Sequence, residues 1–173
     1  THPTPGFPND EEGYTAFMAA NAYPRGTLCV SEMIGANISV KAAADGNHYD
    51  LIELTNAGAE PVSLLGYALS DNPNNPGKWV FPDVSVPAGG CLVVYASELN
   101  KTEVSELHAN FSVNRDGDSV YLFSPTGEML DKLQSGAFVS DVSYGRDASG
   151  KPAYFTEPTF GQVNGSGYAG ITA

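Results

Sequence analysis

Basic residues are scarce in this sequence of 173 residues. Eight Lys and Arg stand against 20 Asp and Glu, which gives a formal net charge of −12. This charge repels the phosphate backbone of nucleic acids, and no cluster of Lys or Arg interrupts it, so we expect no nucleic-acid partner. An acidic, lysine-poor composition is typical of proteins outside the cell, and we expect an extracellular or cell-surface (secreted) location.

Long apolar runs are also missing. The sequence has no stretch of about 18 apolar residues, so we expect no insertion into a membrane. No basic segment followed by an apolar one opens the sequence, and we expect no signal peptide within it. The opening residues are instead typical of the middle of a protein, which leaves the destination of a longer parent protein open.

Cysteine occurs twice, as Cys29 and Cys91, each within an apolar segment typical of a strand. There is no CxxC pair, which excludes the usual zinc and redox motifs. Two alternatives stay open for the pair. The cysteines form a disulfide if their strands face each other across the core, or they are buried free thiols that act as small apolar side chains.

Catalytic motifs are lacking as well. The sequence has no GxSxG nucleophile turn, no HExxH and no phosphate-binding loop. Its three histidines, His2, His48 and His108, stand apart from one another, and we expect structural or surface roles for them. We therefore predict that the chain is not an enzyme.

Short apolar segments are abundant from Thr27 onward. They are five to eight residues long, rich in Val, Leu, Tyr and Phe, and separated by Gly, Pro, Asn and Asp. This pattern predicts an all-β sandwich or barrel without a long helix. The sequences NRDGDS (114–119) and SPTGEM (124–129) predict hairpin turns. The predicted strands begin with LCVSEMI (28–34), YDLIELTN (49–56) and PVSLLGYALS (61–70).

The first 26 residues follow a different pattern. Asn9 or Asp10 is a suitable helix N-cap, and acidic residues follow it at the positive end of the helix dipole. Tyr14, Phe17 and Met18 then share one helical face. We predict a short helix that ends before Pro24.

The order of the β motifs resembles that of the bacterial lamin tail domain family, over roughly residues 27–164. This resemblance implies an immunoglobulin-like β-sandwich of about 8–10 short strands. It implies no residue-level site, because the motif positions are structural. The motifs are SE (31–32), IEL (52–54), LxGYxLSD (64–71), WxFP (79–82), PAGG (87–90), HxNF (108–111) and SYGR (143–146).

The two ends of the sequence repeat each other. PTPGFPN (3–9) matches PTFGQVN (158–164), and Gly13 and Tyr14 match Gly167 and Tyr168 after one gap. The spacing from Pro3 to Pro158 indicates a period of 155 residues, the size of one sandwich plus a connector. We expect residues 1–26 to be the end of a preceding repeat plus a connecting helix, residues 27–164 to be the sandwich, and residues 165–173 to begin the next connector.

Two sets of oxygen-bearing side chains are candidate sites. Glu32 and Glu53 lie in neighbouring predicted strands, where a facing pair of carboxylates would share a proton, bind a cation or act as acid and base. The alternative is that each pins a loop through hydrogen bonds. Hard-oxygen ligands suited to Ca²⁺ gather in three further segments, although no EF-hand pattern is present. The candidate ligands in the first two are Asp45, Asn47, Asp50, Asp71, Asn74 and Asn75. The third segment is NRDGD (114–118), with Asp116 and Asp118, which a turn explains better.

The main hypothesis from sequence is a non-catalytic spacer or protein-interaction module, monomeric within a larger multidomain bacterial protein, with no cofactor. Two alternatives remain. One is a ligand-binding module for glycans or for calcium-dependent contacts, and the other is an enzyme that uses Glu32 and Glu53.

Overall fold

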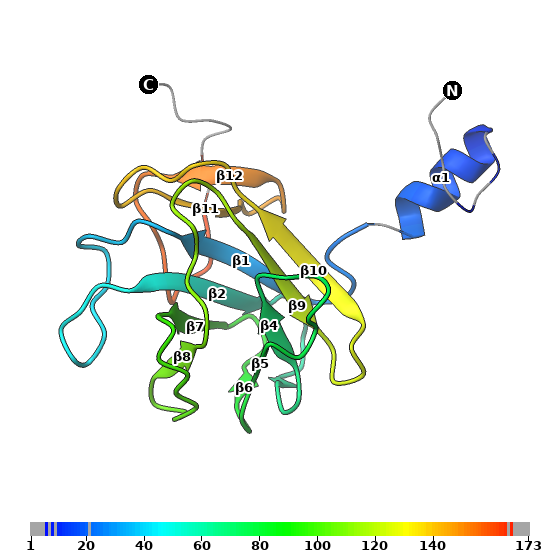
Figure 1. The fold of residues 1–173 in the computed structure, drawn as a ribbon. Helices are drawn as coiled ribbons and strands as arrows, with labels where there is room; N and C mark the ends of the chain where they lie inside the picture. The colour runs from blue at the N-terminus through cyan, green and yellow to red at the C-terminus, as the bar shows by residue number, and fades with distance from the viewer. Residues whose placement is uncertain (1–5, 7, 9, 21, 166, 168–173) are drawn as a thin grey trace.

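Twelve strands and one helix make up the described chain. The computed structural model describes residues 6, 8, 10–20, 22–165 and 167. Its larger sheet has six strands, and all neighbours in it are antiparallel except β7 and β8 (Figure 1). In spatial order these strands are β12 (Pro152–Phe155), β11 (Ser143–Arg146), β1 (Leu28–Ile34), β2 (Asp50–Asn56), β7 (Cys91–Ala96) and β8 (Leu107–Ala109).

A four-stranded antiparallel sheet packs against the larger one. It consists of β10 (Met129–Gln134), β9 (Ser119–Phe123), β4 (Ala68–Ser70) and β5 (Trp79–Val80). A small pair, β3 (Val62–Ser63) with β6 (Ser85–Val86), completes the sandwich. The predicted all-β sandwich is confirmed.

The main core lies between the two sheets. Alternate residues of β1 and β2 point into it, among them Val30, Met33, Ile52 and Leu54, all fully buried. The indole of Trp79 is 2% exposed and meets a phenylalanine ring edge to face. Alternation along a strand places the intervening residues of β1 and β2 on the outer face of the sheet.

Local patterning predicted most strands but not how they pair. The predicted strand 28–34 has the bounds of β1, whereas the segment 61–70 divides into β3 and β4 around a turn at Gly66. SPTGEM forms the β9–β10 hairpin as predicted. The hairpin predicted at residues 114–119 is wrong. That turn carries the chain from β8 to β9, which belong to different sheets, because Phe111 and Val113 bury their side chains in the core between the sheets.

The outer face of the larger sheet is partly covered by loops. Ile34, Leu51 and Tyr95 form a second apolar cluster on this face, and Ala43 and Phe160 pack over it. Phe160 belongs to the segment that follows the last strand. Two loops far apart in sequence therefore meet on this face and shield its centre from solvent.

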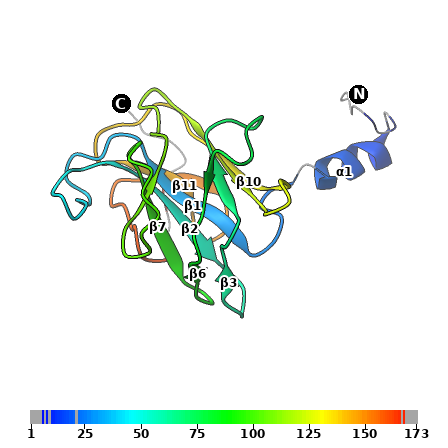
Figure 2. The same cartoon turned by 60° about the horizontal axis from the view of Figure 1, so that its bottom comes forward.

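Helix α1 (Glu11–Ala20) is confirmed, with Asp10 as its N-cap. The Asp10 carboxylate accepts the Gly13 N–H at 2.7 Å. The helix stands away from the sandwich in two views (Figures 1 and 2). The Phe17 and Met18 side chains and most of residues 165–173 lie outside the described residues. No helix among the described residues is long and apolar enough to cross a membrane.

Candidate functional site

An irregularity in β1 places two consecutive polar residues on the outer face. The pairing of β1 with β2 shifts by one residue between Val30 and Glu32. Val30 and Met33 still point into the main core. Ser31 is the extra residue of this β-bulge, so both Ser31 and Glu32 turn toward the outer face.

Glu32 and Glu53 lie directly opposite each other on β1 and β2. Both side chains are 0% exposed. A buried carboxylate costs free energy unless its oxygens receive hydrogen bonds. The donors that surround this pair therefore decide what the pair does.

Glu32 receives its hydrogen bonds from β11 and from the segment after β12. The Ser143 hydroxyl donates to Oε1. The Thr159 N–H is 3.2 Å from Oε1, and the Thr159 hydroxyl is 3.2 Å from Oε2. One carboxyl group thus joins three strands or segments of the outer face.

Glu53 uses different donors. The Ser31 hydroxyl donates to Oε1 at 2.7 Å, and the Gly161 N–H donates to Oε2 at 2.6 Å. The two carboxyl groups therefore accept hydrogen bonds from separate sets of donors. The structure brings the predicted pair together, and both members hold the segment around residues 159–161.

Asn164 completes this attachment. Its amide Nδ2 donates to the carbonyls of Ser31, at 2.9 Å, and Arg146, at 2.8 Å. Its Oδ1 lies 2.9 Å from the Thr159 hydroxyl. We call residues 158–164 the latch, and we call Ser31, Glu32, Glu53 and Ser143 the cradle.

Burial controls the protonation of the cradle. Desolvation raises the pKa of Glu53 to about 7, against the lowering effect of its hydrogen bonds, and burial likewise raises the pKa of Glu32. The Thr159 hydroxyl has one hydrogen but two acceptors, Glu32 Oε2 and Asn164 Oδ1. A proton on Glu32 Oε2 satisfies all three groups, because the acid then donates to Thr159 while Thr159 donates to Asn164.

This arrangement is suited to fastening rather than to acid–base chemistry. A catalytic carboxyl must lie within hydrogen-bond reach of a substrate atom. Each cradle carboxyl instead spends its oxygens on donors of the chain, and neither is exposed. The two carboxyls hold a loop, which is one of the roles expected from the sequence.

A second buried charge fastens the two sheets to each other. Asp131 on β10 is fully buried and accepts the Val30 N–H at 2.7 Å. It also pairs with the Arg146 guanidinium of β11. The sequence alone does not single out Asp131, since its partners lie far away along the chain. The SYGR motif contains Arg146 but does not reveal this pairing.

A Ser–His–Glu chain of hydrogen bonds lies at the β7–β8 end. The Ser97 hydroxyl is 2.8 Å from His108 Nδ1, and His108 Nε2 is 2.9 Å from a Glu106 oxygen. The order matches that of a nucleophile, base and orienting acid. The imidazole, however, is 1% exposed and stacks on Tyr95, and the Ser97 hydroxyl also accepts the Leu99 N–H at 3.3 Å. This series of hydrogen bonds therefore closes the loop between β7 and β8.

The predicted calcium ligands are placed in several loops. Asp45 binds the Asn47 N–H and the Tyr49 hydroxyl within its own turn. Asp71 pairs with Lys78 at 2.6 Å in the β4–β5 loop, where Asn75 makes turn bonds through its backbone. Asp50 begins β2 and accepts the Val113 N–H, and burial raises its pKa to about 6.

Asp71 also lines an open hollow together with other acidic residues. This hollow of about 370 Å³ is also lined by Asp116, Asp118 and Tyr121. Within the described residues, no group of three or more His, Cys, Asp or Glu side chains is arranged to hold a metal ion.

The free cysteines lie on the uncovered part of the outer face. Thr55 of β2 pairs with Cys29 on one side and with Cys91 on the other. Two strand spacings, about 9.5 Å, separate the cysteine backbones, which is beyond the reach of a disulfide. Both are half-buried free thiols. Burial raises the pKa of Cys29 to about 11, so its thiol is a poor nucleophile.

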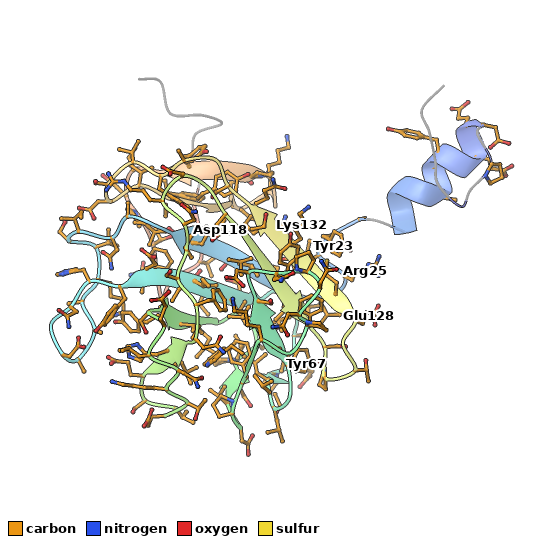
Figure 3. All side chains as sticks on the ribbon, viewed as in Figure 1. Tyr23, Arg25, Tyr67, Asp118, Glu128 and Lys132 are labelled. Atoms are coloured by element: carbon orange, nitrogen blue, oxygen red, sulfur yellow. The ribbon has the colours of Figure 1, made fainter. Side chains whose placement is uncertain are left out.

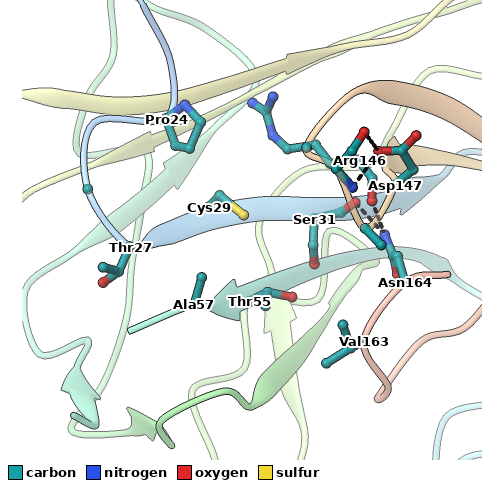
Figure 4. Close-up of a pocket in the computed structure, with 14 residues that line it drawn as sticks. Pro24, Thr27, Cys29, Ser31, Thr55, Ala57, Arg146, Asp147, Val163 and Asn164 are labelled. Atoms are coloured by element: carbon teal, nitrogen blue, oxygen red, sulfur yellow. Dashed lines mark hydrogen bonds between the residues drawn. The ribbon is translucent and has the colours of Figure 1, made fainter. Parts of the chain in front are cut away.

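Cys29 faces a pocket beside the latch. The pocket measures about 360 Å³, and its lining includes Pro24, Thr55, Arg146 and Val163 (Figure 4). The same view shows Asn164 bonded to the Ser31 and Arg146 carbonyls. The pocket therefore lies where the incoming connector and the latch approach each other on the outer face.

Together, the two packed sheets define an immunoglobulin-like β-sandwich. The model of the lamin tail domain family matches residues 21–137. The chain belongs to this family, which is a non-catalytic, immunoglobulin-like class of domain. No curated protein matches the sequence.

Proposed function

We propose that this chain is a non-catalytic spacer or protein-interaction module of a larger extracellular or cell-surface bacterial protein. The observation that carries the proposal is the use of the buried cradle. Glu32 and Glu53 hold the segment that leaves the sandwich. A domain that uses two buried carboxyl groups to hold its outgoing segment is suited to linkage.

The incoming segment is fastened too. The Arg25 N–H donates to the Leu130 carbonyl at 2.6 Å, and its guanidinium lies 3.7 Å from Glu128 (Figure 3). The Ala57 N–H donates to the Thr27 carbonyl beside β1. Because the latch is also bonded to Ser31 of β1, the incoming and outgoing segments are tied to the same strand. Tension applied between the two ends of the module would therefore reach β1 through both its incoming and its outgoing segment.

The charge supports the same role. A net charge of −12 favours solubility and self-repulsion between modules, and it opposes binding to polyanions. The module is monomeric in this proposal and works as one of several units in a chain, without a cofactor.

Force spectroscopy and enzyme assays test the proposal. Pulling the full chain from its two ends should give one cooperative unfolding event, and Asn164→Ala should lower its force by removing two hydrogen bonds to the sandwich. The purified chain should not hydrolyse ester, phosphate or glycoside substrates. Hydrolysis that disappears in Glu53→Gln or in Ser97→Ala would overturn the non-catalytic role.

A ligand-binding module for glycans or for calcium-dependent contacts is the second candidate. The open hollow lined by Asp71, Asp116 and Asp118 is the place to test it, and these three carboxylates are not arranged as a metal site. Calorimetric titration with Ca²⁺ and a glycan array separate the two candidates. Heat of Ca²⁺ binding that is lost in Asp118→Asn, but retained in the control Glu60→Gln, would establish the second candidate. If neither Ca²⁺ nor any glycan binds, the result supports the spacer or protein-interaction role.

A further inference from the structure

The opening stretch of the chain contains the latch sequence a second time. Residues 3–9 are PTPGFPN and the latch is PTFGQVN, so Pro, Thr, Gly and Asn recur at the same spacing. The remaining three positions differ. The structure shows what the shared positions do, and this gives the repeat a physical meaning.

Three of the four shared residues make the bonds to the sandwich. Thr159 binds Glu32 through its N–H and hydroxyl, and the Gly161 N–H binds Glu53. Asn164 binds the carbonyls of Ser31 and Arg146. The opening stretch carries the same groups as Thr4, Gly6 and Asn9. The spacing that the two stretches share is therefore the spacing of the contact residues.

The residue types that form the turn of the latch also recur in the opening stretch. The Gln162 N–H donates to the Thr159 carbonyl at 2.8 Å, and Gly161 has φ +89° at the third position. A positive φ at that position alone defines a type II turn, which favours Pro at the second position and Gly at the third. The opening stretch has Pro5 and Gly6 at these positions, and Gly6 has φ +83°.

The differing positions tolerate the exchange. Val163 is 63% exposed, so Pro8 in its place loses little burial. The backbone N–H groups of Phe160 and Val163 make no hydrogen bond to another described residue, so proline removes none there. Phe160 contributes apolar contact over the second cluster, and Phe7 offers a ring two positions later.

We propose that residues 3–9 are a second latch, which binds the Ser31, Glu32, Glu53 and Ser143 cradle of another sandwich of this kind. The proposal rests on the proposed role as a module in a larger chain, since such a chain places a preceding sandwich next to these residues. Within one chain, residues 158–164 already occupy the cradle. In a larger chain the acceptor is the preceding sandwich, for which residues 3–9 take the place of residues 158–164. An isolated second copy of this chain becomes an acceptor only when its own latch is weakened or displaced.

Peptide binding tests this directly. The acceptor is the full chain with Thr159→Ala and Asn164→Ala, which weaken its own latch, and with Thr4→Ala and Asn9→Ala, which prevent self-competition. A fluorescein-labelled peptide of residues 1–12 should bind this chain with saturable anisotropy, and an unlabelled peptide of residues 157–165 should displace it. The labelled peptide with Thr4→Ala and Asn9→Ala should bind about tenfold more weakly for each lost hydrogen bond. Binding of the 157–165 peptide without binding of the 1–12 peptide overturns the proposal.

If the acceptor loses its fold and binds neither peptide, a latch exchange decides. Phe160→Pro, Gln162→Phe and Val163→Pro convert the latch into PTPGFPN within the full chain. The control carries Thr159→Ala, Gly161→Ala and Asn164→Ala, which keep the differing residues and replace the three shared residues that make the bonds to the sandwich. The exchanged chain should melt close to the unmodified chain and well above the control, whereas melting as low as the control refutes the second latch. Either failure leaves the non-catalytic module role standing, which hydrolysis assays test separately.

Discussion

Replacement of Glu53 by Gln should stabilise the sandwich at alkaline pH. Glu53 is fully buried, and one of its oxygens accepts the Gly161 N–H while the other lies beside the Ser31 hydroxyl. In Glu53→Gln, the amide oxygen still accepts from Gly161. The amide NH₂ donates to Ser31 Oγ, which acts as an acceptor because a hydroxyl serves in either role. The variant thus reproduces the protonated carboxyl without its titration.

The magnitude follows from the pKa. Burial raises the pKa of Glu53 from 4.5 to about 7, so the folded state holds this proton more tightly than the unfolded state. The corresponding stability is fully present below pH of about 4.5 and is lost as the pH rises through about 7. The shift corresponds to about 3 kcal/mol of unfolding free energy.

Urea unfolding at a series of pH values between 4.5 and 8.5 measures this. The difference in unfolding free energy between Glu53→Gln and the unmodified chain should grow by about 3 kcal/mol across the range. Glu60→Gln is the matched control, because Glu60 is exposed and its curve should follow that of the unmodified chain. Parallel curves for Glu53→Gln and the unmodified chain would falsify the assignment of a buried, titrating carboxyl.

Two further substitutions probe the fastenings around the bulge. Gly145→Ala should lower the unfolding free energy by about 2–3 kcal/mol through overpacking, because an added Cβ would lie 2.1 Å from a backbone oxygen of β1. Gly77→Ala is the control, because the space around Gly77 is open, and it should leave the unfolding free energy nearly unchanged in the same urea titration. Asp131→Ala should lower the unfolding free energy by about 3–5 kcal/mol, because it leaves the Arg146 charge without its partner against the sheet. Asp71→Ala, which removes one member of a partly exposed ion pair, should lower it by at most about 1 kcal/mol in a matched thermal melt. Equal losses for the two aspartates would contradict the buried role of Asp131.

The sequence by itself determined the class of fold. Strand segments can be predicted from the local sequence, because the alternation of apolar side chains depends only on neighbours along the chain. The bounds of β1 follow from such a pattern. The same holds for the helix that Asp10 caps, since capping joins residues three apart.

Register and long-range partners were decided by the tertiary structure. The one-residue bulge at Ser31 has no local signature, yet it turns Ser31 and Glu32 to the same face as Glu53. The bond from Thr159 to Glu32 spans 127 residues, and no periodicity in the sequence connects the two.

The cysteines and the repeat show the same division. Sequence left a disulfide open, and the strand order closed the question by inserting β2 between Cys29 and Cys91. The repeated PTxGxxN was visible in the letters alone. Only the fold showed that its Thr, Gly and Asn are the residues that hold buried carboxylates and carbonyls, because hydrogen-bond partners are chosen by proximity in space rather than along the chain.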